Sequence, residues 1–176
     1  MDEGGLVAAA KEGEGEAFLR LVEGHQGQLR AFLRGMTGDR ELAEDAAQET
    51  FLQAWQGLGG LRQEDRFSSW LYTIARRTAL KHLKQRSLAV PLDDAPPVED
   101  RRAPDPVLRQ DLDAALALLD PEQRAAFLLV PVFGLEYQEA AEVLGCPVGT
   151  VASRVSRARV RLAAALATDE EEVTPR

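Results

Sequence analysis

The sequence contains one cysteine, Cys146, and two histidines, His25 and His82. A single cysteine excludes an internal disulfide and a cysteine-rich zinc site, and two histidines are too few for a histidine cluster. No apolar run approaches the length of a membrane span, and the acidic start, Met1-Asp2-Glu3, lacks the basic segment of a signal peptide. These shortages predict a cytoplasmic protein with no metal, no cofactor and no membrane span.

Most of the prolines lie in one segment. Residues 87–110 contain five of the nine prolines, and their acidic residues outnumber the basic ones. Because proline lacks a backbone donor and disfavours helix at the residue before it, we expect an extended, flexible linker here. A chain of 176 residues has room for two small domains, at 1–86 and 111–168, with a disordered acidic tail at 169–176. No strand-like alternation occurs in either domain, which predicts an all-α fold.

Acidic residues are missing from two windows, 66–92 and 143–168, although the whole chain carries a formal charge of −8. A basic surface on an acidic protein can hold a nucleic-acid backbone while the net charge discourages indiscriminate binding. Two solvent-facing helix sides would give the same pattern. The basic residues are Arg66, Arg76, Arg77, Lys81, Lys84 and Arg86 in the first window and Arg154, Arg157, Arg159 and Arg161 in the second.

The first two helical patterns of the first domain are amphipathic. One covers 18–33 and places His25 on its buried side. The other, about 40–57, has small and apolar residues on one face and acids and amides on the other, with Leu52 among them. An apolar residue within a charged stripe suits a protein-contact surface, although a solvated face with a single leucine would look the same.

The third helix is expected to begin near Ser68, a suitable N-cap, with an apolar face turned inward and a basic face outward. Trp70 and Tyr72 lie near its start. Cations beside aromatic rings suit single-stranded nucleic acid, whose bases stack or are flipped into pockets. Trp70 taken by itself is more simply a core residue. The inward face comprises Phe67, Leu71, Ile74, Ala75, Thr78 and His82.

The second domain is predicted to contain a helix-turn-helix. After a first helix at 107–119, Asp120-Pro121-Glu122-Gln123 supplies an N-cap, a proline at the first helical position and a capping-box partner for a helix that runs to about Val132. A short helix at 137–144, a turn at 145–147 and a long last helix follow. The second helix of such a motif lies in the major groove, where arginine reads guanine or holds phosphate. The last helix has a packing face of Val148, Val151, Val155, Ala158 and Leu162, beside a polar stripe of Thr150, Arg154, Arg157 and Arg161.

These segments together resemble the bacterial RNA polymerase sigma factors of the extracytoplasmic-function (ECF) subfamily. AEDAAQETFLQAW (43–55) and RFSSWLYTIARRTALKHLKQR (66–86) are similar to the family's region two, and LDPEQRAAFLL and EYQEAAEVLGCPVGTVASRVSRARVRL are similar to its region four. The resemblance implies a subunit that catalyses nothing, binds core RNA polymerase, directs it to specific promoters and stabilises the opened strands. It implies as partners the polymerase clamp coiled coil and flap, promoter DNA and an anti-sigma factor.

The resemblance implies that the acidic linker passes through polymerase channels, where its carboxylates mimic phosphate. It also implies roles for residues on three surfaces. Core-polymerase binding is expected at Asp45, Gln48, Glu49 and Leu52. Recognition of the minus-ten element is expected at Arg66, Trp70, Thr73, Arg76, Arg77, Lys81 and Lys84. Recognition of the minus-thirty-five duplex is expected at Thr150, Ser153, Arg154, Arg157 and Arg161.

One stretch, Val130-Pro131-Val132-Phe133, is more apolar than the corresponding part of the family. We hypothesise a partner surface there, for an anti-sigma factor or the polymerase flap. Ordinary burial is the alternative.

Two other functions are compatible with parts of the sequence. A stand-alone helix-turn-helix regulator would usually need a dimer interface to read two half-sites, and it leaves the acidic and basic helices of the first domain unexplained. An enzyme could use Glu41, Glu44, Asp45 and Glu49 as a carboxylate metal site. No histidine accompanies them at ligand spacing, and one exposed helix face makes no enclosed pocket.

Overall fold

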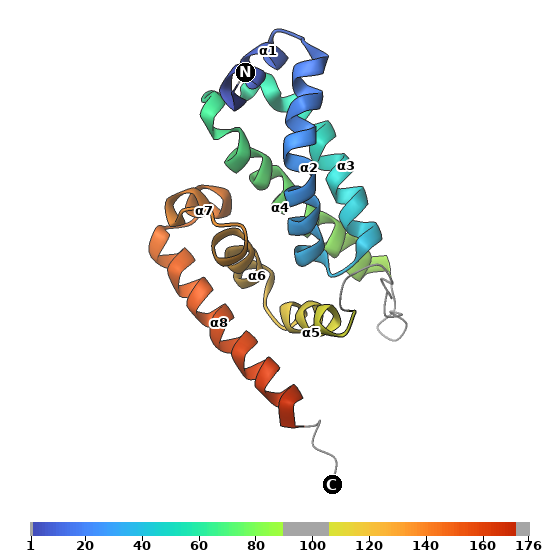
Figure 1. Ribbon diagram of the computed structural model, residues 1–176, viewed down its shortest axis with the longest axis vertical. Coiled ribbons are helices and arrows are strands. Elements are labelled where there is room, and N and C mark those ends of the chain that lie inside the picture. The colour runs from blue at the N-terminus through green and yellow to red at the C-terminus, as the bar shows by residue number, and fades with distance from the viewer. Residues whose placement is uncertain (1, 90–105, 172–176) are drawn as a thin grey trace.

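The computed structural model describes residues 2–89 and 106–171, and every regular element in these ranges is helical, which confirms the all-α prediction. The first domain comprises α1 (Glu3–Lys11), α2 (Gly15–Thr37), α3 (Arg40–Gly57), the 3₁₀ turns η1 (Leu58–Gly60) and η2 (Glu64–Arg66), and α4 (Phe67–Ala89). The second comprises α5 (Pro106–Ala117), α6 (Pro121–Phe127), the π-helical turn η3 (Leu128–Val132), α7 (Tyr137–Leu144) and α8 (Val148–Glu171). Figure 1 shows the two groups of helices packed against each other.

Helices α2, α3 and α4 form a bundle whose apolar faces are those that the helical periodicity predicts. α2 ends at Gly38, whose φ of 65° is a left-handed conformation that favours glycine. Asp39 then caps α3, because its side chain accepts a hydrogen bond from the backbone N–H of Leu42. The chain therefore reverses within two residues and lays α3 against α2. The fully or almost fully buried side chains of the bundle include Leu21, Leu29, Phe32, Leu33, Met36, Phe67 and Leu71.

Helix α1 has no counterpart among the predicted helices. Its signals were present in the sequence, since Asp2 is an N-cap residue and is followed by a short apolar run. Val7 is fully buried against the bundle, and Lys11 forms an ion pair of 2.7 Å with Glu64 in η2. α1 therefore supports the loop that leads into α4. His25, predicted on the buried side of α2, is half-buried.

The start of α6 is formed largely as its sequence predicts. The Asp120 carboxylate accepts hydrogen bonds from the backbone N–H groups of Glu122 and Gln123, and Pro121 occupies the first turn. The predicted capping box is wrong, because Gln123 is buried and its Oε1 has no hydrogen-bond partner.

The helix-turn-helix lies where the sequence predicts it. α7 spans the predicted residues, and Gly145 ends it with a φ of 62° before α8 begins. The prediction that Val148 lies on the packing face of α8 is wrong, because its side chain is 39% exposed. As the first residue of the helix, it lies beyond the reach of the core. The buried side chains of α8 are Val151, Val155, Ala158 and Leu162.

Several predicted boundaries differ from the observed ones. α4 begins at Phe67, directly after the turn η2, so Ser68 lies inside the helix and is not its N-cap. The predicted linker at 87–110 overlaps helix at both ends, since α4 continues to Ala89 and α5 begins at Pro106. The predicted disordered tail is also wrong for 169–171, which belong to α8. The rest of the predicted linker, 90–105, and of the tail, 172–176, lies outside the described residues.

The two domains pack through α2 and α4 on one side and α6, η3 and α7 on the other. The ring centroid of Phe133 lies 6.2 Å from that of Phe32 and 6.3 Å from that of Tyr72. Phe133 is half-buried by these contacts and also lines a cavity between the domains, so the partner surface hypothesised at 130–133 stays a prediction. Val132 beside it is exposed.

Arg124 of α6 donates hydrogen bonds to backbone carbonyl groups near helix ends in both domains. Its guanidinium donates hydrogen bonds to the carbonyl oxygens of Leu116, Ala117 and Leu119 at the end of α5, at 2.8, 3.2 and 3.1 Å. A fourth bond, of 2.7 Å, reaches the carbonyl of Met36 near the end of α2. Burial lowers the pKa of Arg124. One cation thus caps two helix ends, where unpaired carbonyls concentrate negative partial charge.

Candidate nucleic-acid interface

A cavity of about 350 Å³ opens beside the start of α4 and the loop before it. Trp70 forms part of its wall and packs on Phe67, with ring centroids 6.0 Å apart, so this tryptophan is half-buried. Three of the predicted minus-ten residues, Arg66, Trp70 and Thr73, meet here. The remaining lining residues are Leu61, Arg62, Gln63, Ser69 and Glu142. Arg62 and Gln63 were not among the predicted residues, although their position just before a basic helix was a usable signal.

The outward face of α4 is less uniformly basic and exposed than predicted. Arg77 and Lys84 are exposed, but the side chain of Arg76 is only 17% exposed. Its Nη2 donates to Glu122 of α6, and its Nε is buried with no hydrogen-bond partner. The prediction of an open basic face is therefore wrong at Arg76, because the second domain covers it.

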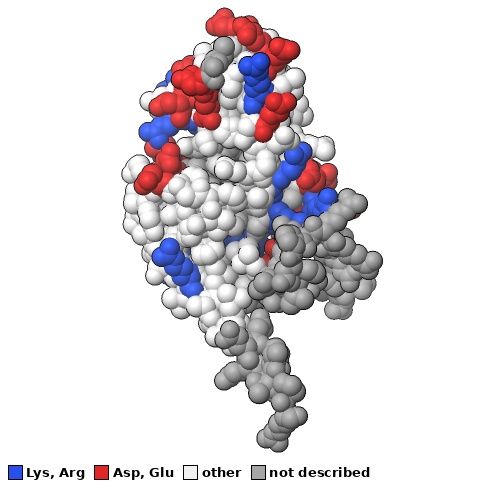
Figure 2. Space-filling model, viewed as in Figure 1, with Lys and Arg blue, Asp and Glu red and all other residues white. Residues whose placement is uncertain are grey.

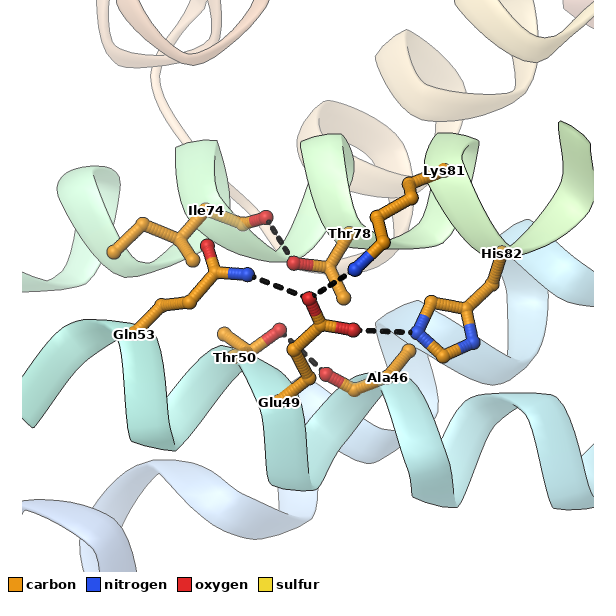
Figure 3. Close-up of polar contacts among 8 residues, drawn as sticks. All are labelled: Ala46, Glu49, Thr50, Gln53, Ile74, Thr78, Lys81 and His82. Atoms are coloured by element: carbon orange, nitrogen blue, oxygen red, sulfur yellow. Dashed lines mark hydrogen bonds and ion pairs between the residues drawn. The ribbon is translucent and has the colours of Figure 1, made fainter. Parts of the chain in front are cut away.

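Glu49 and Lys81, predicted for two different surfaces, bind each other across α3 and α4. As Figure 3 shows, the Glu49 carboxylate lies 2.6 Å from the Nζ of Lys81 and 2.7 Å from the Nε2 of His82, and Gln53 donates a third bond of 2.8 Å. Hydrogen bonds from Lys81 and His82 hold the pKa of Glu49 below its ordinary value. Beside Glu49 on α3, the buried hydroxyl of Thr50 donates a hydrogen bond of 2.6 Å to the carbonyl oxygen of Ala46, one turn earlier in the same helix (Figure 3). This hydroxyl is therefore satisfied although it is buried where α3 packs on α4.

The rest of the predicted polymerase-binding stripe on α3 is exposed. Asp45, Gln48 and Leu52 all face solvent, and Leu52 is 56% exposed. Trp55 extends the stripe by one turn, being 41% exposed while it packs on Phe18 with a centroid distance of 4.9 Å. Sequence reasoning did not single out Trp55, although its spacing of three residues from Leu52 placed it on the same side of the helix.

The predicted DNA stripe on α8 divides into exposed and covered residues. Arg157 and Arg161 are exposed, and Thr150 and Ser153 are half-buried. Arg154 is largely covered, since its Nη1 lies 3.0 Å from the Oε2 of Glu122 and donates to the Sγ of Cys146 at 3.3 Å. The structure therefore places Arg76 and Arg154, from two separate predicted DNA surfaces, on the same carboxylate.

Acidic side chains gather elsewhere on the surface. Figure 2 shows them at the end of the first domain where α1 lies, while the middle of the same face carries almost no charge. Such a distribution disfavours binding of polyanions at that end of the molecule.

The carboxylates of the alternative metal site do not converge. Glu44 pairs with Arg30 at 3.0 Å, Glu49 pairs with Lys81, and Glu41 and Asp45 are exposed. In the described ranges 2–89 and 106–171, no group of three or more histidine, cysteine, aspartate or glutamate side chains is placed to hold a metal ion. A search of the same residues found no helix with the length and apolar character needed to cross a bilayer.

Comparison with known proteins gives consistent matches along the chain. The models of Sigma-70 region 2 and Sigma-70 region 4 match residues 21–88 and 109–162. The ECF RNA polymerase sigma factor SigM of Mycobacterium tuberculosis is 38% identical over 160 residues, which cover 90% of this chain and 81% of SigM. The RNA polymerase sigma-H factor of Pseudomonas aeruginosa is 33% identical, with 92% of each chain covered.

Two solved structures show the same architecture. The structure of CnrH in complex with the cytosolic domain of CnrY has a TM-score of 0.77 at 28% identity, covering 95% of this chain and 98% of CnrH. The sigma factor RpoE of Bartonella quintana, in complex with the anti-sigma factor NepR, has a TM-score of 0.73 at 30% identity, covering 86% and 98%. Sigma factors act by binding and not by catalysis. The chain belongs to the ECF family of RNA polymerase sigma factors, and it is an alternative sigma factor that binds core polymerase and directs it to promoters.

Proposed function

We propose that three helix faces divide the work of this sigma factor. In this proposal α3 binds core polymerase, α4 with the loop before it binds the minus-ten element, and α8 reads the minus-thirty-five duplex. The boundaries follow the same division, with 1–86 acting as region two and 111–168 as region four. The protein itself catalyses nothing, and it works in the cytoplasm, where its polymerase is.

The observation that carries the proposal is the exposed stripe of Asp45, Gln48 and Leu52 on α3. A leucine exposed among charged and amide side chains suits a protein contact with an apolar centre and an orienting rim. We assign Trp55 to the same surface. Glu49 lies at its edge, where its bonds to Lys81 and His82 also fix α3 against α4.

The cavity beside α4 supports the minus-ten role. Its volume of about 350 Å³ lies within the range of about 300–1,000 Å³ common for small-ligand pockets, which is enough for one unstacked base. Trp70 offers an aromatic wall, Thr73 and Gln63 offer polar groups for a base edge, and Arg66 offers a cation for the adjoining phosphate. Arg77 and Lys84 would follow the strand along the helix.

On α8, the exposed Arg157 and Arg161 support contact with the phosphates of the minus-thirty-five duplex. Thr150 and Ser153 lie in the first turns of the helix, the part that approaches base edges in a helix-turn-helix. Arg154 would join them once it is released from Glu122.

An anti-sigma factor is the further partner that we propose. A second cavity, of about 310 Å³, lies between the domains and is lined mainly by apolar side chains of α2, α5, α6 and η3. Ala31, Leu116 and Val132 are among them. Two relatives of the same architecture were solved with CnrY and with NepR, which supports a partner of this kind for this chain as well.

The test is a binding titration of the labelled protein with sigma-free core polymerase. An Asp45→Ala/Gln48→Ala/Leu52→Ala variant should bind at least about tenfold more weakly, since loss of a contact centre typically costs more than about 1 kcal/mol per important residue. A Glu23→Ala/Gln28→Ala variant, altered at exposed positions of α2, is the matched control and should bind as the wild type does. Equal binding by all three proteins would remove α3 from the polymerase interface. Binding to duplex DNA as a dimer, with no binding to core, would favour the stand-alone regulator.

A further inference from the structure

Helix α1 contacts the loop that precedes α4 and forms one wall of the proposed base pocket. Among the helices of the first domain, α1 has the most extensive contacts with η2, the turn within this loop, and it also packs on η1 and on α4. α1 is therefore the main support that the loop receives from elsewhere in the first domain. The loop spans 61–66, and four of its residues line the cavity: Leu61, Arg62, Gln63 and Arg66.

One end of α1 is bound to the loop by an ion pair. The Nζ of Lys11, in the last turn of α1, donates a hydrogen bond of 2.7 Å to the Oε1 of Glu64. The side chain of Lys11 is only 20% exposed, and its hydrogen bond holds the pKa of Glu64 below the ordinary value. Glu64 follows Gln63 directly, and the backbone N–H of Arg66 donates to the Gln63 carbonyl at 3.1 Å. A shift of Glu64 would therefore move two residues that line the cavity.

The other end of α1 is connected to the aromatic wall of the cavity. The Oε2 of Glu3, the first residue of α1, lies 2.7 Å from the Nε2 of His25 in α2. The imidazole of His25 meets the ring of Phe67 edge-on, with centroids 5.3 Å apart. Phe67 is buried and contacts Trp70 at a centroid distance of 6.0 Å. The carboxylate of Glu3 thus fixes the imidazole, which packs on the ring that supports Trp70.

Both connections matter because the walls of a base pocket need fixed positions. An unstacked base is recognised by hydrogen bonds to its edge and by contact with an aromatic face. Such groups are selective when the side chains behind them hold them to within about 0.5 Å. The regular structure in the loop 61–66 is the short turn η2, and 3₁₀ hydrogen bonds have poorer geometry than those of an α-helix. The loop therefore depends on outside support, and the two ends of α1 support the two walls of one cavity.

We propose that α1 positions the walls of the base pocket and thereby sets the selectivity of the pocket among bases. The ion pair of Lys11 and Glu64 holds the loop, and the pair of Glu3 and His25 holds the aromatic wall. These four residues are positioning residues, which act through the side chains that line the cavity and do not touch DNA. The inference rests on the proposed minus-ten role of the cavity. Neither pair includes a residue of the exposed stripe on α3, so loss of either pair leaves binding of core polymerase unchanged.

The experiment measures base selectivity in the holoenzyme, assembled from the full chain and core polymerase. Bound strands are recovered from a pool of short single strands of random sequence, and sequencing gives the ratio of the preferred base to the other bases at each position. Lys11→Met should lower this ratio about fivefold at one position, an effect typical of a supporting residue in a coupled network. Arg30→Met is the matched control. It breaks an ion pair of 3.0 Å with Glu44, between α2 and α3, and should leave every ratio unchanged.

Two further variants separate positioning from the loss of a side chain or a charge. Lys11→Glu/Glu64→Lys restores the ion pair with its charges exchanged and should recover the ratio of the wild type. Glu64→Gln removes a negative charge, which by itself would raise the affinity for all strands equally, but the loosened loop should lower the ratio as Lys11→Met does. Titration with core polymerase and urea unfolding should show that these variants bind core and are folded at the assay temperature.

The aromatic wall is tested by the fluorescence of Trp70 in the free protein. Trp55→Phe leaves Trp70 as the only tryptophan of the chain. In this background Glu3→Ala should increase the quenching of Trp70 by acrylamide, because the rings behind Trp70 are held less firmly. In the holoenzyme, with Trp55 retained, Glu3→Ala should lower the same selectivity ratio. Glu23→Ala, at an exposed position of α2, should change neither quantity.

The results distinguish this proposal from the assignment of the cavity to a base. Trp70→Ala removes the aromatic wall itself. If Trp70→Ala lowers the ratio while Lys11→Met and Glu3→Ala leave it at the wild-type value, the cavity binds a base and the positioning role of α1 is refuted. A ratio that Lys11→Met lowers and the charge exchange does not recover would overturn the role of the ion pair. If Trp70→Ala leaves every ratio unchanged, the minus-ten role of the cavity fails first.

Discussion

Replacement of Arg124 by methionine should destabilise the protein more than any comparable change of a surface arginine. The guanidinium donates to four carbonyl oxygens at the ends of α5 and α2, with distances between 2.7 and 3.2 Å. Hydrogen bonds from a charged donor contribute about 1.5–3 kcal/mol each in net terms, but water can replace the donor at carbonyls near a helix end. Burial, which lowers the pKa of Arg124, also reduces what the cation contributes. We therefore expect a loss of about 2–4 kcal/mol in the free energy of unfolding, well below the sum of four bonds.

The assay is urea unfolding followed by circular dichroism. With a denaturant slope of about 2 kcal/mol per M, in the middle of the usual range for urea, the midpoint should fall by about 1–2 M for Arg124→Met. Arg159→Met is the matched control, since Arg159 is exposed on α8, and its effect should stay within about 0.5 kcal/mol. Arg124→Lys keeps the charge but not the fork of donors, and it should lie between the two. A midpoint for Arg124→Met equal to that of Arg159→Met would refute the role given to these four bonds.

Three further predictions follow from single positions. Gly38→Ala should lower the free energy of unfolding by about 1–2 kcal/mol, because φ is 65° there and a Cβ disfavours that conformation; a midpoint equal to that of Gly24→Ala, inside α2, would contradict this. Glu49→Gln should be less stable than the wild type near neutral pH, and the difference in the free energy of unfolding should vanish on acidification. The folded-state pKa of Glu49 lies below its ordinary value of 4.5, so the stabilisation by the carboxylate is present above pH 4.5 and is lost as the pH falls through the lower, folded-state pKa. Urea unfolding curves of both proteins at several pH values would check this. Leu129→Ala, at a fully buried position of η3, should cost about 2–5 kcal/mol in thermal or urea unfolding, whereas Leu118→Ala, at an exposed position, should cost far less.

Local features of this chain were predictable from the sequence because short-range physics sets them. The 3.6-residue spacing of apolar side chains placed α3 and α7 at their observed bounds, and Asp120 with Pro121 marked the start of α6. The wrong predictions were also local. Ser68 is not the N-cap of α4, because the turn η2 leads directly into a helix that already begins at Phe67. α1 was not predicted, because it is short and rich in alanine. A nine-residue helix of that composition is marginal by itself. It is stabilised here by burial of Val7 and by the ion pair between Lys11 and Glu64, and helical periodicity reveals neither contact.

The candidate surfaces were predicted in part. Exposure of Leu52, Arg157 and Arg161 follows from helix geometry, since residues three and four apart share a face. The same rule placed Glu49 and Lys81 on two functional surfaces, and only the packing of α3 against α4 brought them together. Resemblance of motifs assigned these residues to partners, but it carried no information on which of them bind each other.

The sequence by itself determined every helix except α1, together with the helix-turn-helix and the family, because spacing, capping and motif order are properties of neighbouring residues. Only the tertiary structure decided that Arg76 and Arg154 are covered rather than open. Glu122 stands 46 residues from Arg76, in the other domain, and their contact depends on how two separately patterned bodies pack. Charge segregation marked where the cations are. The carboxylate that pairs with Arg76 and Arg154 comes from Glu122, in a segment with no sequence pattern that links it to either arginine. Contacts between residues so far apart in the sequence depend on how the helices pack and not on the local sequence.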